Sequence, residues 1–263
     1  MTLFNFTDKT TLFLPGCYSL AFLSDKVENY KKILKKLDIR PVISDNFFCC
    51  AGSLLEAGYE KEARKIAKEN HALLKERGIT KIVTSCALCY KTLTQDYKEI
   101  VPNWDIQTEF ILEIIFNKLK KNIDLIKNTF LEEIAYYDSC YFGRYLHFYD
   151  VPRDLIMFLG YKLVELPYKK EETLCCGGCG NLLIANKDLA DKIAEDFIKM
   201  LKRRDIKKVI TADLQAYRHL KDYLKNSSIK DIEIIDFSDL LCKTLNIRPE
   251  VIEEEEGGRI ENE

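Results

Sequence analysis

The chain has no excess of positive charge and no long apolar run. Its 40 Lys and Arg residues face 42 Asp and Glu residues, which gives a net charge of −2. Such a chain has no bulk charge with which to neutralise phosphates. No stretch reaches the roughly 18 apolar residues of a membrane span. These absences argue against nucleic acid and membrane as partners.

Three familiar sequence signals are also missing. The N-terminal sequence MTLFNFTDKTTLFLPG has neither the basic region nor the apolar core of a signal peptide, so we expect a cytoplasmic protein. No predicted strand is followed by the dinucleotide-binding pattern G-x-G-x-x-G. The C-x2-C-x2-C-x3-C run of ferredoxins is absent as well. Histidine is scarce, and we interpret the isolated His71, His147 and His219 as surface or packing residues.

Cysteine, in contrast, is abundant, with ten residues in a chain of 263. Without an export signal, clustered thiols are metal ligands more often than members of a disulfide framework. Cys242 stands alone in the helical segment FSDLLCKTL, and we predict that it is a small buried apolar residue. The other nine cysteines form two groups, which suggests two sites.

The first group follows the pattern C-x31-CC-x35-C-x2-C. Its members are Cys17, Cys49, Cys50, Cys86 and Cys89. A Cys-x-x-Cys at a helix start directs two sulfurs to one metal assembly, and paired cysteines in an irregular loop can reach neighbouring metals. The spacing is not that of a zinc ribbon. A cubane iron–sulfur cluster needs only four thiolates, so five predict a metal site and favour iron.

The second group belongs to a degenerate repeat of the first. YYDSCYFGRYL, ETLCCGGCGNLL and VITADLQAYRHL follow one another at nearly the spacing of the first three loops. An ungapped match puts Asp213 opposite Cys86, and Ala216 opposite Cys89, so a second five-cysteine site cannot form. The thiols that remain are Cys140, Cys175, Cys176 and Cys179.

This second group leaves several alternatives open. Four thiols could hold an ordinary iron–sulfur cubane or a tetrahedral zinc, or the site could be empty. Asp213 could supply an oxygen ligand, but we favour its simpler role as a helix N-cap. The glycines of GGCG (177–180) could cradle a phosphate, but we favour a loop folded around the cysteine pair. We interpret the nearby aromatic residues as core, namely Tyr141, Phe142, Tyr145 and Phe148.

Strand and helix patterns alternate along the chain and predict an α/β fold with parallel sheets. In the first half we predict strands at 11–16, 40–45 and 79–84, helices at 24–39, 54–78 and 85–101, and a strand leading into a helix over 106–121. Ser24 is the expected N-cap of its helix, and Gly58 is a place where the long helix could break.

The second half repeats this order. We predict strands at 133–140, 162–166, 207–211 and 232–236, and helices at 151–160, 181–205, 214–226 and 237–245. Ligands of open α/β sheets bind at the C-terminal ends of the strands, where Cys17, Cys86 and Cys140 fall. We expect two Rossmann-like, pseudo-symmetric halves, 1–125 and 126–249, and a solvated, disordered acidic tail at 250–263.

At these cysteines the chain resembles the CCG family of cysteine-rich domains, and most closely the B-type subunit of heterodisulfide reductase. The family pattern is C-x31–39-CC-x35–36-C-x2-C, usually present twice. The first half matches it in full, the second departs from it, and the resemblance covers about residues 10–247. It implies two α/β halves and a non-cubane [4Fe-4S] cluster on the first five cysteines, and the second site could hold another iron–sulfur cluster or zinc.

The resemblance also implies an oxidoreductase subunit that reduces a disulfide or relays electrons. Its expected partners are a ferredoxin-like iron–sulfur subunit or a flavoprotein, and its substrate would be a small thiol or disulfide. Related subunits serve the oxidation of 2-hydroxy acids and some succinate or fumarate oxidoreductases, so an electron-transfer subunit of that kind is an alternative. A zinc-binding structural subunit without redox chemistry is another.

Overall fold

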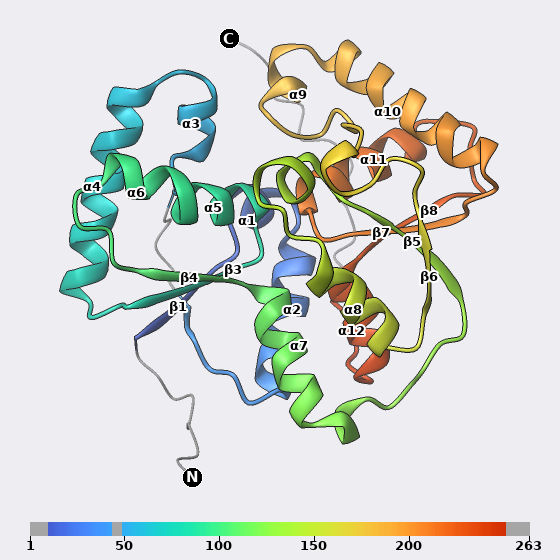
Figure 1. Cartoon of the computed structure of the whole chain (residues 1–263), viewed down its shortest axis with the longest axis horizontal. Helices are drawn as coiled ribbons and strands as arrows, with labels where there is room; N and C mark the ends of the chain where they lie inside the picture. Colours follow the sequence, from blue (N-terminus) through green and yellow to red (C-terminus); the bar gives the residue numbers. More distant parts are fainter. Residues whose placement is uncertain (1–9, 44–48, 251–263) are drawn as a thin grey trace.

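The computed structural model describes residues 10–43 and 49–250. These residues form two four-stranded parallel sheets with helical cover, which lie side by side in Figure 1. The strand order is β2-β1-β3-β4 in the first sheet and β6-β5-β7-β8 in the second. The two orders are the same four-strand pattern used twice, so the predicted α/β fold of two parallel-sheet halves is confirmed.

The first half is built around the central strands β1 and β3. Its strands are β1 (Thr11–Leu14), β2 (Val42–Ile43), β3 (Lys81–Thr84) and β4 (Gln107–Phe110). Its helices are α1 (Cys17–Phe22), α2 (Ser24–Lys36), α3 (Gly52–Glu56), α4 (Glu60–Glu76), α5 (Ala87–Lys91), α6 (Tyr97–Ile100) and α7 (Ile111–Lys121), with the π-helical turn η1 (Thr92–Asp96).

The second half repeats this arrangement around β5 and β7. Its strands are β5 (Glu133–Tyr137), β6 (Lys162–Glu165), β7 (Lys208–Thr211) and β8 (Glu233–Asp236). Its helices are α8 (Asp150–Phe158), α9 (Leu182–Ala185), α10 (Lys187–Arg203), α11 (Leu214–Lys225) and α12 (Phe237–Thr244), and the short turns are η2 (Ile123–Leu125), η3 (Tyr141–Tyr145) and η4 (Lys170–Glu172).

The central strands are apolar because helices cover both faces of each sheet. All four residues of β1 are buried, and so are the last three of β3 and of β7. The helices bury one face each. In α2 this face includes Val27, Tyr30 and Ile33. Each such side chain contributes about 1.5–3 kcal/mol through burial.

Three local predictions differ from the structure or are refined by it. The predicted helix 54–78 is two helices, since Gly58 adopts a φ of 84° between α3 and α4. The predicted helix 181–205 is also divided, because Asn186 ends α9 and caps α10 through the Leu189 N–H. Ser24 is not an N-cap. It is the first residue of α2, and Leu23 occupies the cap position without a side-chain hydrogen bond.

Two other predictions fall partly outside the described residues. The strand expected at 40–45 is seen only as β2, and residues 44–48 are not described. The acidic tail lies outside the described residues from 251 onward. Glu250 itself packs against α2, where its N–H donates to Asn29 Oδ1 at 2.7 Å and its carboxylate pairs with Lys32. None of the helices within the described ranges has the length and apolar character needed to cross a membrane.

The two halves are joined through α2 and α12. Lys26 of α2 donates from Nζ to both carboxylate oxygens of Asp239 at 2.8 Å, and Asn29 Nδ2 donates to Asp239 Oδ1 at 3.3 Å. The Lys26 side chain is almost fully buried. Separating the helices would leave this buried cation with only Asp25 of its own helix, at 3.0 Å, so the contact with Asp239 favours the observed position of α12.

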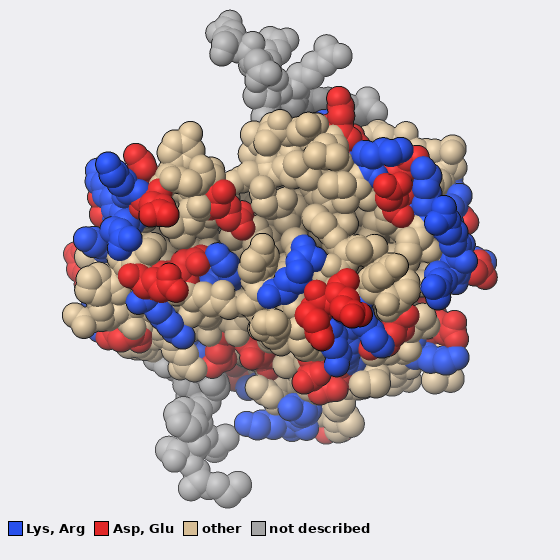
Figure 2. Space-filling model, turned by 45° about the horizontal axis from the view of Figure 1, so that its top comes forward, with Lys and Arg blue, Asp and Glu red and all other residues tan. Residues whose placement is uncertain are grey.

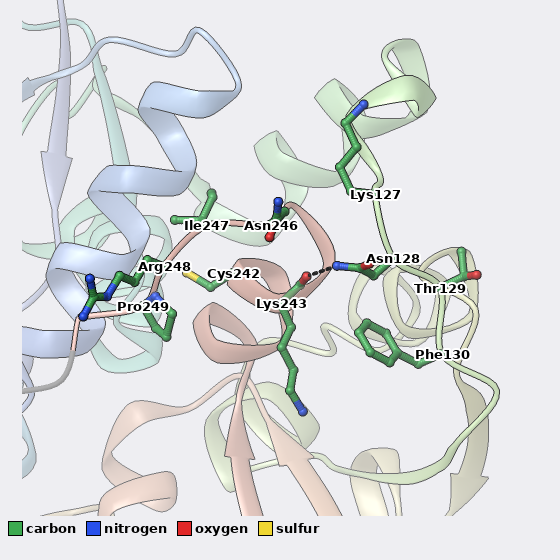
Figure 3. A pocket seen from close by; sticks show the side chains of 10 residues that line it. All are labelled: Lys127, Asn128, Thr129, Phe130, Cys242, Lys243, Asn246, Ile247, Arg248 and Pro249. Carbon is green, nitrogen blue, oxygen red and sulfur yellow. Dashed lines mark hydrogen bonds between the residues drawn. The ribbon is translucent and has the colours of Figure 1, made fainter.

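The connection between the halves runs along the C-terminal end of α12 (Figure 3). The Lys127 and Asn128 N–H groups donate to the Thr244 carbonyl at 2.9 and 3.2 Å, and the Asn128 side chain donates to the Lys243 carbonyl at 2.9 Å. A hollow of about 810 Å³ opens beside these contacts. The side chains of Lys127, Lys243 and Arg248 point in different directions, so their charges do not converge on one point.

Asp236 is a fully buried carboxyl group at the start of α12. Its Oδ1 accepts a hydrogen bond from the Ser238 N–H at 2.8 Å. Burial and, to a lesser extent, the nearby Asp239 charge raise the pKa of Asp236 to about 7, although hydrogen bonding with Ser238 and the Lys26 charge oppose both effects. The folded protein therefore binds this proton more tightly than the unfolded chain, and the protonated form favours folding.

We expect the contribution of Asp236 to the free energy of unfolding to fall as the pH rises from about 4 to about 7, by up to about 1.4 kcal/mol per pH unit. Asp236→Asn keeps an oxygen acceptor for the helix cap but cannot titrate, so it should lose that part of the slope. Urea unfolding of both proteins across this pH range measures the difference. Equal slopes would show that Asp236 does not titrate in this window.

Candidate metal centre

Three loops of the first half bring five thiols together at the C-terminal edge of its sheet. Cys17 begins α1 directly after the β1 turn, and Cys86 follows β3. The thiols that the sequence placed in one group all line one cavity of about 320 Å³, namely Cys17, Cys49, Cys50, Cys86 and Cys89. The Cys50 and Cys89 Sγ atoms are 3.2 Å apart. The spatial grouping expected from the spacing is therefore present.

Backbone geometry orients these sulfurs. Cys86 is the N-cap of α5, and its Sγ accepts the Cys89 N–H at 3.4 Å. The Cys49 Sγ accepts the Ala51 N–H, also at 3.4 Å, because Ala51 adopts a φ of 61° and turns the chain back. Each of these two sulfurs thus faces a backbone donor, and such donors favour the thiolate form that metals bind.

The thiols also share protons with one another. A hydrogen bond with Cys17 lowers the pKa of Cys49 to about 6, and the same contact raises the pKa of Cys17. A hydrogen bond with Cys89 lowers the pKa of Cys86, while the pKa of Cys89 is raised by its contacts with Cys50 and Cys86. A metal group binds thiolates and displaces the protons of the thiols that it contacts. Close thiols that already share protons are therefore suited to binding such a group.

Two features show that the pocket fits a group held by these sulfurs. A Cβ on Gly16 would lie 2.6 Å from Cys86 Cβ and 3.0 Å from its Sγ, so only glycine leaves room beside the thiols. The Thr92 hydroxyl is fully buried and has no hydrogen-bond partner. It faces Gly52, which lines the cavity and lies two residues after Cys50. A buried hydroxyl without a partner and a space kept clear of side chains fit a site built for an additional group.

Gly16→Ala should destabilise the protein and disturb Cys86. The matched control is Gly58→Ala, because both glycines have a positive φ, 90° and 84°, but nothing lies within 4 Å of a Cβ on Gly58. Both variants carry about 1–3 kcal/mol of backbone strain, and overpacking adds about 1–3 kcal/mol at Gly16 alone. Urea unfolding and the metal content of both purified variants measure the difference. Equal losses of stability with unchanged metal content would contradict a close-packed thiol site.

The second half preserves the backbone plan of the first site with altered ligands. The Cys86 N–H donates to Thr84 Oγ1 at 3.1 Å, and the Asp213 N–H donates to Thr211 Oγ1 at 3.3 Å. Asp213 caps α11, since its Oδ1 accepts the Gln215 N–H at 3.0 Å. The N-cap role predicted for Asp213 is therefore present, at the position that Cys86 holds in the first half.

The second group of thiols is also gathered, with Asp213 beside it. Hydrogen bonds with Cys175 and Cys179 lower the pKa of Cys140 to about 3. Cys179 Sγ lies 3.5 Å from Asp213 Oδ2. Burial raises the pKa of Cys176 to about 12. Within residues 10–43 and 49–250, no three His, Cys, Asp or Glu side chains already surround the position of a single metal ion.

A buried ion pair holds the loop that leads to the second cysteine pair. Arg153 donates to Asp138 Oδ1 and Oδ2 at 2.9 and 2.6 Å, and to Glu165 at 2.8 Å. The Lys170 N–H donates to Asp138 Oδ2 at 2.8 Å, and Thr173 Oγ1 donates to the Asp138 carbonyl at 2.5 Å. Asp138 therefore fixes the chain before Cys140 and the loop before the second pair, a role that the sequence analysis missed.

The cavity at the first site opens between the two halves. Its walls include Tyr18 and Phe22 from α1, and Leu183 and Ile184 from α9. The Tyr18 and Phe22 ring centroids are 5.1 Å apart. Sequence analysis missed these walls, because neither short helix carries a pattern that separates a cleft wall from ordinary surface.

Other residues have the structural roles that the sequence suggested, with one exception. His219 is buried and its Nε2 is 3.1 Å from the Ala190 carbonyl, while His71 is 3.1 Å from Asp105. Tyr141 and Phe142 are core residues, but Tyr145 is 51% exposed, so its assignment to the core was wrong.

The remaining two assignments concern a loop and a lone thiol. A Cβ on Gly177 would lie 2.4 Å from the Ala190 carbonyl oxygen, so the GGCG segment serves close loop packing. The helix that follows it, α9, has four residues. Cys242 is fully buried in α12 and lines the hollow of Figure 3 rather than either thiol group.

Comparison with known proteins gives relatives that carry iron–sulfur or reductase names. The D-type subunit of the dihydromethanophenazine:CoB–CoM heterodisulfide reductase of Methanosarcina acetivorans is 26% identical over 225 residues, which are 83% of this chain and 55% of that protein. An uncharacterized iron–sulfur protein of Methanocaldococcus jannaschii is 26% identical over 238 residues, 89% of this chain and 46% of that protein. The B-type subunit of the fumarate reductase (CoM/CoB) of Methanothermobacter marburgensis is 22% identical over 236 residues, 87% and 45% respectively.

The chain spans about half the length of these curated relatives. The heterodisulfide reductase relative is the D-type subunit of its enzyme, whereas the sequence pattern suggested the B-type subunit. A family model described as a cysteine-rich domain, CCG, matches residues 11–94 and 134–221, once in each repeated half. These matches cover more than half of the chain, which therefore belongs to the CCG family of cysteine-rich domains.

Proposed function

We propose that this chain is an iron–sulfur redox subunit of a multi-subunit oxidoreductase resembling heterodisulfide reductase. The observation that carries the proposal is the set of five thiols from three loops that line one cavity between the halves. The relatives named as heterodisulfide reductase and fumarate reductase subunits support the same class of chemistry. In this proposal residues 1–125 carry the complete site and residues 126–249 carry the altered one.

The proposed cofactor is a non-cubane [4Fe-4S] cluster on Cys17, Cys49, Cys50, Cys86 and Cys89. Such a group supplies one-electron transfer, and five thiolates exceed the four that a cubane needs. The chain's own residues orient the sulfurs through the Cys89 and Ala51 N–H donors. The aromatic and aliphatic walls of the cavity limit the access of water to the sulfurs, which strengthens electrostatic interactions there.

The altered second site favours electron relay over paired reduction of a disulfide. Asp213 occupies the place of a thiol and uses Oδ1 to cap α11. We propose that Cys140, Cys175, Cys176 and Cys179 bind a second iron–sulfur cluster or zinc, with Asp213 Oδ2 near Cys179. A relay subunit of a 2-hydroxy-acid or succinate/fumarate oxidoreductase is therefore the second candidate.

The proposed partners are a ferredoxin-like iron–sulfur subunit or a flavoprotein. No predicted strand of the chain leads into G-x-G-x-x-G, and no ferredoxin cysteine run is present. Electrons must therefore enter or leave through another group. A protein of Syntrophomonas wolfei named EtfAB:quinone oxidoreductase is 29% identical over 137 residues, which are 51% of this chain and 18% of that protein, and its name is compatible with an electron-relay role.

Rapid mixing tests the proposed activity. The chain is reconstituted anaerobically, reduced with dithionite and freed of excess reductant, which bleaches the visible absorption of a cluster. Mixing with a small disulfide or with the oxidised partner flavoprotein should restore this absorption as the cluster is oxidised. Oxidation by the partner but not by any disulfide would assign the chain to electron relay. A reduced chain that neither acceptor oxidises would contradict both forms of the proposal.

A further inference from the structure

The cleft at the five thiols has, among the described residues, a lining without carboxylate or basic side chains. It is formed by sixteen residues from both halves, and none of these described residues is Asp, Glu, Lys, Arg or His. The larger apolar and aromatic side chains of this lining are Tyr18, Phe22, Leu88, Leu183 and Ile184. The few polar side chains of the walls are uncharged amides and hydroxyls, such as Gln215 and Ser53.

Charged residues near the cleft are occupied by other contacts. Arg218 pairs with Asp222 at 3.2 Å and donates from Nη1 to the Phe22 carbonyl at 3.3 Å. Its guanidinium lies 4.4 Å from the Phe22 ring centroid. Glu56 accepts a hydrogen bond from the Tyr141 hydroxyl at 2.6 Å. Both charged groups therefore already have partners, and neither residue is among the described ones that line the cleft.

The same distribution appears on the molecular surface. Figure 2 shows a largely uncharged area in the upper middle of this face, with Lys, Arg, Asp and Glu on both sides of it and below it. Ile184 on the cleft wall is 89% exposed and Phe22 is 51% exposed. Large apolar side chains left in solvent at the mouth of a cleft mark a binding surface.

The walls of the cleft come from both halves and are well defined. Its volume of about 320 Å³ includes the space next to the sulfurs that a cluster would fill, so the space left for a second occupant suits only a small molecule. Asn181 Nδ2 donates to the Ser53 carbonyl at 3.0 Å, and this hydrogen bond joins the two halves beside the cleft. A cluster on the thiols would occupy the floor, and the walls from α1 and α9 would remain for a second occupant.

We infer that the cleft binds a small, uncharged organic ligand with apolar arms and discriminates against anionic ones. An anion placed here would lose its hydration without gaining a cationic partner, which is costly in an apolar surrounding. An uncharged ligand gains from the burial of its apolar surface against Phe22, Leu183 and Ile184. The predicted binding preference does not depend on the proposed function. Only the role of the bound ligand as the redox substrate of the site rests on it.

Calorimetry with two redox-inert thioethers tests this inference. Thiodipropionate is a dianion near neutral pH, and its dimethyl ester has the same thioether core without charge. We expect the full-length protein to bind the ester at least about tenfold more tightly than the dianion. Ile184→Lys should lower the ratio of the ester's affinity to the dianion's affinity at least about threefold, because it adds a cation at the mouth of the cleft.

The matched control is Leu131→Lys, which adds the same charge at a residue that is 95% exposed and outside the cleft. It should leave the ratio unchanged. The inference would be overturned if the two thioethers bound equally tightly, if the dianion bound more tightly, or if neither bound. It would also be overturned if both lysine variants changed the ratio of affinities equally. Binding of a thioether requires no electron transfer, so a protein that binds the ester but holds no iron would refute the proposed function alone.

Discussion

Replacing Cys50 or Cys89 with alanine should abolish the main cluster signal. The two sulfurs are 3.2 Å apart and both residues are buried, so water cannot readily replace either ligand. Substitution of residues that hydrogen-bond to a metal ligand lowers metal affinity about 10–100-fold. Loss of the ligand itself should lower the affinity at least as much. Iron content and low-temperature EPR of the anaerobically reconstituted variants measure the effect.

Cys242→Ala is the control for this pair. Cys242 is equally buried, but it belongs to α12 and lines the separate hollow of Figure 3. Its replacement removes a thiol from the core without touching either cysteine group, so the cluster signal should remain unchanged. Equal loss of signal in all three variants would mean that the assignment of the ligands is wrong.

Arg153→Ala should destabilise the protein by about 3–5 kcal/mol, because it leaves the buried Asp138 without its cationic partner. The Arg153 and Asp138 side chains are 7% and 0% exposed, respectively. Asp138 also holds the Lys170 N–H and precedes Cys140 by two residues, so loss of the pair should disturb the second thiol group more than the first. Urea unfolding, together with the metal content of the variant, measures both effects.

Glu165→Gln is the control for this variant, because Glu165 is the second carboxylate that Arg153 contacts. The Glu165 side chain is 31% exposed and shares Arg153 with Asp138, so its neutralisation leaves the buried pair intact. We expect a loss of less than about 1 kcal/mol. If Arg153→Ala and Glu165→Gln were equally mild, the buried pair would not position the second thiol group.

The repeated fold and the thiol groups follow from local sequence, because each depends on a few residues near one strand end. Strand β3 ends before Cys86, and β7 ends before Asp213, with the same Thr hydroxyl hydrogen bond in both. The period of apolar residues indicates the strands, and the turn residues indicate where the chain leaves the sheet. Spacing, together with these local signals, was therefore enough to predict which cysteines gather.

The cleft walls could not be predicted in this way, because they depend on how the halves meet. Phe22 and Ile184 are far apart in sequence, and both look like ordinary surface residues of short helices. They line one cleft because contacts such as Asn181 with Ser53 place α9 beside the first half. The Arg153–Asp138 pair was missed for a related reason, since its burial results from tertiary packing of α8 on the second sheet.

Analysis of iron and acid-labile sulfide, combined with low-temperature EPR on the full chain prepared and reconstituted without oxygen, tests the central claim most directly. The five-thiol site predicts a coloured protein with at least about four iron and four sulfide per chain and a paramagnetic state on oxidation or reduction. A colourless protein that contains only zinc and shows no paramagnetic state would contradict the claim and favour a structural role.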